Sequence, residues 1–181
     1  LRQAVRHGAQ VSSLNAVHDD WAMPLAQRMT AAPSGWADAL AQVAAAIASA
    51  KGVPAPAPAD AGDAAKAIAA SLLSGEGKAL LIGNAAAQHP QASQLLALTQ
   101  WIGAQVGATV GYLCESGNSV GAQLVGALPR AGGFDAGQML RRPMKALFLL
   151  GIEPAFDAAN PVAASEALKT AGLVVSMTPF K

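Results

Sequence analysis

The sequence predicts an α/β protein with a parallel, doubly wound sheet flanked by helices. Three short runs, ALLI at 79–82, KALFLL at 145–150 and LVVSM at 173–177, place apolar residues at successive positions. Such continuous apolar runs are typical of parallel strands buried on both faces. From residue 78 onward, helical segments of about ten to fifteen residues separate the strands. This alternation favours parallel strands joined by helical crossovers.

The composition excludes several classes of protein. Of 181 residues, 52% are hydrophobic and 13% charged, and the net charge is +1. Disorder requires low hydrophobicity with high net charge, a single cysteine cannot build a disulfide framework, and no basic stripe predicts a nucleic-acid partner. Residues 79–114 lack charged side chains, but polar residues, proline and glycine interrupt them. Because no apolar run reaches ~18 residues, we expect no membrane insertion.

The first part of the chain predicts the end of one helix, two complete helices, one strand and a linker. A helix ends near residue 7, with Gly8 suited to the left-handed position that follows, and residues 11–14 form the one clear strand of the first sixty. Ser34 is the predicted N-cap of a helix that continues to residue 50. A proline- and alanine-rich linker at 51–58 and a second helix at 60–74 follow.

The rest of the chain alternates strands with helices. The expected order is strand 79–82, helix 91–106, strand 109–113, a short helix or turn-rich segment at 118–127, strand 145–150, helix 160–170 and strand 173–177. The strands at 79–82 and 145–150 both end in glycine, at Gly83 and Gly151. Those two turns are the predicted ligand-binding positions, because open α/β sheets bind ligands beyond the carboxyl ends of their strands.

The two turns have the small residues that a ligand-binding loop needs. Gly83 and Asn84 begin the first turn, and Gly151, Glu153 and Pro154 lie in the second. Small residues allow close approach to the backbone, and a following helix offers free N–H groups to an anion. Neither turn matches GxGxxG or GxxxxGK[ST], so a plain strand-to-helix turn stays open as the alternative.

Other candidate residues each have a structural alternative. Cys114 is a candidate nucleophile with His89 as its base, or a small buried hydrophobe. His18, Asp19 and Asp20 are three possible ligands in a row, or a solvated turn. Glu153 and Asp157 are either an acid–base pair or capping groups. The Arg141–Arg142 pair is either a basic surface pair or a contact with a neighbouring subunit. The three tryptophans are either packing anchors or a stacking platform: Trp21, Trp36 and Trp101.

Several segments together resemble one family. They are ESGNSVGAQLVGALP (115–129), AGQMLRRPMKALFLLGIEPAFDAANP (136–161), ALKTAGLVVSMTPF (167–180), the opening LRQAVRHGAQVSSLN and the later HDDWAMP. Taken in their order along the chain, these segments are similar to the large peripheral-arm subunit of bacterial respiratory complex I, the proton-translocating NADH-quinone oxidoreductase. The resemblance covers nearly the whole chain. The chain opens in mid-pattern at Leu1, and we expect it to be a piece of a longer protein.

The resemblance implies a fold, a context and partners. Residues 60–181 resemble the Rossmann-like, molybdopterin oxidoreductase-like region of that subunit, and residues 1–59 would belong to a neighbouring lobe with its helix and linker. The full complex passes electrons from NADH through iron–sulfur clusters to quinone. The implied partners are the other peripheral-arm subunits and the rest of the chain's own subunit. The implied location is peripheral, on the cytoplasmic side of the bacterial inner membrane; no signal peptide is apparent.

The resemblance also implies that this segment holds no cofactor. One cysteine cannot ligate an iron–sulfur cluster alone, so the clusters are expected elsewhere in the subunit. In catalytic molybdopterin oxidoreductases one strand-end loop commonly reads G-x-N-P, whereas this chain has Gly151-Ile152-Glu153-Pro154. Because Glu153 would face a phosphate-rich cofactor with like charge, we expect a vestigial pocket of Gly83, Asn84, Gly151, Glu153 and Pro154, without molybdopterin.

The segment is therefore expected to be an inactive scaffold within an active enzyme complex. Two alternatives stay open: a fragment of an active molybdopterin-dependent oxidoreductase resembling formate dehydrogenase, and a small-molecule-binding α/β protein. A piece cut from a larger body exposes apolar surface, so we also expect self-association.

Overall fold

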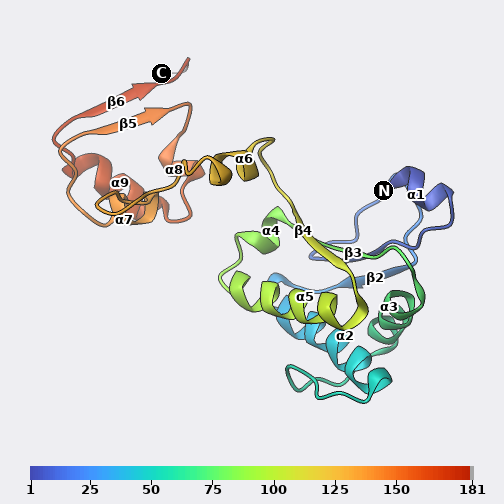
Figure 1. The fold of residues 1–181 in the computed structure, drawn as a ribbon. Coiled ribbons are helices and arrows are strands. Elements are labelled where there is room, and N and C mark those ends of the chain that lie inside the picture. Colours follow the sequence, from blue (N-terminus) through green and yellow to red (C-terminus); the bar gives the residue numbers. More distant parts are fainter. Residues whose placement is uncertain (180–181) are drawn as a thin grey trace. The chain divides into compact units, whose positions relative to one another are not determined.

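The computed structural model describes residues 1–179 and divides the chain into two compact units, 1–117 and 118–181 (Figure 1). Strands of the described residues form three parallel pairs, and helices follow them along the chain. This confirms a mixed α/β protein with parallel strand pairing. Each sheet has only two strands, so a doubly wound sheet is not seen. The end of the last resembling segment, at 180, lies outside the described residues.

The chain begins with a short helix and a parallel strand pair. Helix α1 (Arg2–Arg6) is followed by Gly8 at φ +94°, a conformation that favours glycine. Strand β1 (Ser12–Asn15) pairs in parallel with β2 (Gln27–Thr30). The expectation of a single strand in the first sixty residues was therefore wrong. The segment QRMT has no apolar run or clear alternation, so nothing in its pattern signals a strand.

Helix α2 (Trp36–Lys51) begins later than predicted. A single 3-10 turn, Pro33–Gly35, precedes it, so Gly35 rather than Ser34 is the N-cap, and the predicted role of Ser34 was wrong. The helix includes Lys51, the first residue of the predicted linker, and ends at Gly52 in a left-handed conformation. Helix α3 (Asp63–Ser74) follows the irregular proline-rich stretch.

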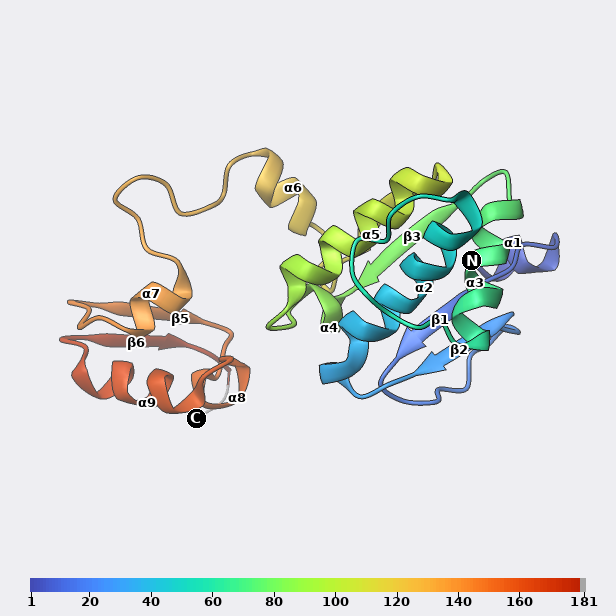
Figure 2. The same cartoon turned by 90° about the horizontal axis from the view of Figure 1, so that it is seen from below.

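Three helices build the core of unit 1 (Figure 2). Helix α2 packs against α3 and against α5 (Ala92–Val106). Alanines at the contacts let the helix backbones approach closely, and Ile47 and Ile102 fill the centre with no exposed surface. The buried members of this cluster are Val43, Ala44, Ile47, Ala65, Ala69, Ile102 and Val106.

The second strand pair of unit 1 is covered by α5. Strand β3 (Ala79–Gly83) pairs in parallel with β4 (Thr109–Leu113), and the one-turn helix α4 (Asn84–Ala87) follows β3. A Cβ on Gly103 of α5 would lie 2.6 Å from Val110 Cγ2, so the helix lies directly against β4. Leu81 is nevertheless 44% exposed. Burial on both faces of this strand was therefore predicted wrongly.

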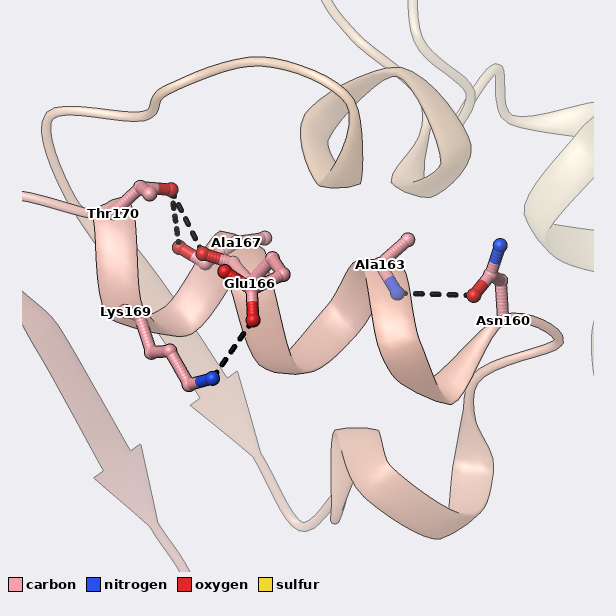
Figure 3. Close-up of polar contacts among 6 residues, drawn as sticks. All are labelled: Asn160, Ala163, Glu166, Ala167, Lys169 and Thr170. Atoms are coloured by element: carbon pink, nitrogen blue, oxygen red, sulfur yellow. Dashed lines mark hydrogen bonds and ion pairs between the residues drawn. The ribbon is translucent and has the colours of Figure 1, made fainter.

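Unit 2 contains the third strand pair and short helices. Helices α6 (Ser119–Leu124) and α7 (Ala136–Leu140) precede strand β5 (Leu147–Leu150). The one-turn helix α8 (Pro154–Asp157), helix α9 (Pro161–Thr170) and strand β6 (Val174–Met177) complete the unit, and β6 pairs in parallel with β5. The side chain of Asn160 accepts the N–H of Ala163 at 2.9 Å and thereby caps α9 (Figure 3).

Unit 2 buries little apolar surface. Its buried apolar residues within the described part are Leu147, Ala164 and Ala167. Phe148 and Leu150 are 69% and 73% exposed and project from the same face of β5, because side chains alternate along a strand. The prediction that this strand is buried on both faces was therefore wrong as well.

The predicted domain boundary at residues 59 and 60 stays a prediction. It rests on the scarcity of predicted strands in the first sixty residues and on the resemblance, whereas the compact units are divided between residues 117 and 118. No helix within residues 1–179 combines the length and apolar character that crossing a bilayer requires.

Candidate functional site

The five predicted site residues divide between two turns in two different units. Gly83 ends β3 and Asn84 begins α4 in unit 1, whereas Gly151, Glu153 and Pro154 follow β5 in unit 2. Each turn lies at the carboxyl end of a parallel strand pair, as the sequence predicted. This is the edge where open α/β sheets bind ligands.

The turn after β3 carries a cluster of amides around one carboxylate. Asn84 Nδ2 donates to Glu115 Oε2 at 2.9 Å. Gln88 Nε2 donates to Asn84 Oδ1 at 2.9 Å and lies 3.5 Å from the same Glu115 oxygen. The pairing of Gly83 with Leu113 places Glu115 two residues beyond the end of the neighbouring strand, which explains how residues 31 apart meet. The sequence singled out Asn84 as a site residue but not Gln88, which lies in the same turn, or Glu115.

This cluster has a definite electrostatic character. A carboxylate only accepts hydrogen bonds, so Glu115 already uses one oxygen for donors of its own protein. Its negative charge repels an anion at this edge. The arrangement therefore suits neutral or positively charged groups better than a phosphate.

Cys114 and His89 do not form the predicted nucleophile–base pair. Cys114 is a free, exposed cysteine, so the alternative of a buried hydrophobe was also wrong. The ring of His89 lies 5.5 Å from that of Trp36, and its Nδ1 accepts the N–H of Gln91 at 3.0 Å. Because these contacts hold the imidazole against α2 and the start of α5, His89 has a structural role here.

Hydrogen bonds tie the turn after β5 to strand β6 and link the residues at the start and end of α8. Gly151 adopts φ +61°, and its N–H donates to Met177 O at 3.0 Å. The N–H of Glu153 donates to Asp157 Oδ2 at 2.6 Å, while Glu153 O accepts the N–H groups of Phe156 and Asp157. Asp157 is thus a capping group, as one of the two interpretations predicted. The N–H of Glu153, one of the backbone donors of this turn, is therefore already bound to a carboxylate of the chain.

A third polar cluster lies at the carboxyl end of the β1–β2 pair. Arg28 Nη1 lies 2.7 Å from His18 Nε2 and donates to Asp19 O at 2.9 Å. Asn15 Nδ2 donates to Asp19 Oδ2 at 2.8 Å. The sequence drew attention to His18 and Asp19 but not to Arg28, because strand β2 was not predicted. These residues form an organised turn at the surface.

Two of the three tryptophans and one arginine of the Arg141–Arg142 pair make packing contacts. Trp36 is buried and donates from Nε1 to Ala31 O at 3.0 Å, and Trp101 packs against the main core cluster. Trp21 lines an open hollow of about 390 Å³ together with Asp19, Asp20 and Arg2. Arg142 lies over the ring of Phe134 at 4.6 Å, a distance typical of a cation–π contact.

Within the described part of the chain, no three His, Cys, Asp or Glu side chains gather in a way that could hold a metal ion. No family model matches this chain, and no curated protein or solved structure matches it.

Proposed function

We propose that this chain is a non-catalytic scaffold segment of the large peripheral-arm subunit of a respiratory NADH-quinone oxidoreductase. Its full subunit would carry the iron–sulfur clusters that pass electrons from NADH toward quinone, and this segment would keep only a vestigial cofactor pocket. The identity in this proposal rests on the resemblance of five segments in the right order. The scaffold role rests on the chemistry of the strand ends.

The observation that carries the scaffold role is that carboxylates of the chain occupy donors at both strand ends. Asp157 accepts the N–H of Glu153 after β5, and Glu115 accepts the amide of Asn84 after β3. A dinucleotide cofactor has a pyrophosphate that needs free N–H groups or cations. Because a carboxylate occupies each turn and repels the negative charge of a pyrophosphate, both turns disfavour such a cofactor.

The proposed fold is finer than the architecture described above. We infer that the parallel pairs are parts of a doubly wound, Rossmann-like sheet of the molybdopterin oxidoreductase type. The support is that helices α5 and α9 connect the paired strands β3 to β4 and β5 to β6, as crossovers in such sheets do. The exposed apolar residues of β5 support a further layer over this strand pair, because parallel sheets are normally covered on both faces.

The proposed partners are the other peripheral-arm subunits and the remainder of the same subunit, on the cytoplasmic side of the bacterial inner membrane. Unit 2 supports this interpretation through its exposed large apolar side chains. Leu124 and Phe156 are both 82% exposed. Exposed apolar patches of several hundred Å² usually mark interaction sites.

Purification of the full-length subunit from its native membranes tests the identity. We expect a tagged subunit that contains this chain to co-purify with NADH:quinone oxidoreductase activity and with other peripheral-arm subunits. An unrelated tagged α/β protein of the same host serves as the control. A tagged protein that purifies alone, or with formate-oxidising activity, contradicts the proposal.

A further inference from the structure

Helix α6 has large apolar side chains that lie mostly in solvent. Val120 and Leu124 are exposed and one helical turn apart, so they share a face of α6, and the exposed Val125 follows directly. We call these three residues the helix patch. Residues 118–129 contain no charged side chain. Because a helix of six residues is marginal in water without packing on its apolar face, α6 needs a surface to lie on.

The strand pair β5–β6 presents an apolar face of the same kind. Phe148 and Leu150 project from one face of β5, and Leu150 pairs with Met177 of β6, which places Met177 on that face too. We call these three exposed residues the sheet face. The segments 146–152 and 173–179, which build it, contain no charged residues. The cores of protein interfaces are depleted of charge in this way, so the sheet face suits an apolar partner surface.

The helix patch and the sheet face together are large enough for a specific contact between two copies of the chain. Their six residues are between 54% and 82% exposed. They present on the order of 800 Å² of surface per copy, which is what each partner buries in an interface of standard size. We propose that α6 of one copy covers the sheet face of a second copy, and the reverse. Because each copy gives and receives the same helix, the contact closes at a dimer.

The connection between α6 and β5 allows this exchange. Residues 125–146 separate the two elements, and residues 127–133 within them are all exposed. Exchange of an identical element across such a connection is a low-cost route to a dimer. The proposal rests on the exposed surface of unit 2 and not on the respiratory identity proposed above, so either can fail without the other.

Light scattering of the 181-residue chain tests the closed dimer. We expect the mass to rise with concentration and to level off at twice the 18.1 kDa of one copy. Leu124→Ser should weaken dimerisation about tenfold, since it removes an apolar side chain from both contacts. Val162→Ser, at a 74% exposed position of α9 outside both surfaces, is the matched control and should keep the original affinity. A mass that stays at one copy, or rises beyond two, overturns the proposal.

Cysteine pairs identify which copy supplies the helix. The exposed Cys114 is first replaced by serine. One chain then has Val120→Cys, and a second chain with a different tag has Leu150→Cys. On mixing and oxidation we expect a disulfide between the two chains, whereas Val162→Cys in place of Val120→Cys should give little product. Equal yields from both valine positions overturn the proposal. So does a single chain with both cysteines that forms the disulfide within itself, because its own α6 then covers the sheet face.

Discussion

Glu115 and Asp157 are exposed carboxylates whose hydrogen bonds run back into their own turns. At an exposed position, such a bond contributes little to global stability because solvent screens the charge. Its consequence is local, since it orders the turn and places negative charge where an anionic ligand would bind. Each carboxylate thus orders its own turn and disfavours an anion there.

Removal of the Asp157 carboxylate should loosen the turn after β5. In Asp157→Ala we expect the N–H of Glu153 to lose its acceptor and to exchange with solvent severalfold faster. Hydrogen exchange measured residue by residue checks this expectation. Glu166→Ala is the matched control, because it also removes an exposed carboxylate of unit 2 but only disrupts the ion pair with Lys169. Unchanged exchange at Glu153 would show that Asp157 does not hold the turn.

Gly103 is a residue at which adding a single methyl group should be costly. Alanine is normally the better helix former by about 1 kcal/mol. A Cβ at Gly103 would, however, meet Val110 Cγ2 at 2.6 Å, so α5 or β4 must shift. We expect Gly103→Ala to lower the free energy of unfolding by about 1–3 kcal/mol, as overpacking does.

Tryptophan fluorescence in urea measures this cost, because Trp21, Trp36 and Trp101 all lie in unit 1. Gly77→Ala is the control, since a Cβ there meets nothing within 4 Å. A Gly103→Ala chain as stable as the original would mean that α5 does not lie against β4 as described.

At the scale of elements, the sequence predicted long periodic segments well and short polar ones poorly. Helices α2, α3, α5 and α9 occur close to where the sequence predicted them, and the apolar spacing within α2 and α3 is the pattern that burial of one helix face leaves. Strand β2 was missed because its residues are mostly polar and half-buried. Helix α4 is a single turn, which is too short to leave a periodic pattern.

The candidate site was predictable only in part, for a related reason. Gly83 and Gly151 were found because each follows an apolar run. Glu115 meets Asn84 and Gln88 through strand pairing, which local pattern does not encode. Arg28 reaches His18 through a strand that was itself missed.

The N-cap of α9 should contribute more to stability than its surface ion pair. Asn160→Ala removes the side-chain acceptor of the Ala163 N–H, and such a loss typically costs about 1 kcal/mol. Lys169→Ala breaks an exposed pair with Glu166 at 2.7 Å, which should cost well under about 1 kcal/mol. Amide hydrogen exchange in unit 2, measured as the temperature rises, compares the stability of the two variants. Equal effects would contradict the assignment of Asn160 as the cap.

At the scale of the whole molecule, the two units differ in how much apolar surface they bury. Unit 1 has a helical core centred on Ile47 and Ile102, whereas unit 2 leaves most of its large apolar side chains exposed. Burial of apolar surface is the main favourable term in folding and association. The exposed apolar side chains of unit 2 support the proposal that partners cover this unit.

The isolated chain should self-associate through this surface. We expect its apparent mass in light scattering to rise with concentration, and the double change Phe148→Ser with Leu150→Ser to reduce that rise. Gln123→Ser, at an exposed polar residue of the same unit, is the control and should leave it unchanged. A monodisperse monomer at high concentration would count against an interface here.

The most direct test of the proposed scaffold role is a cofactor census. The full-length subunit and the 181-residue chain would be denatured and assayed for pterin fluorescence, nucleotide absorbance, and molybdenum, tungsten and iron. We expect iron from the clusters in the full-length subunit, and neither pterin nor molybdenum nor tungsten in either sample. A pterin or molybdenum content near one equivalent would show that the strand-end turns bind a cofactor despite Glu115 and Asp157, and would favour a molybdopterin-dependent oxidoreductase instead.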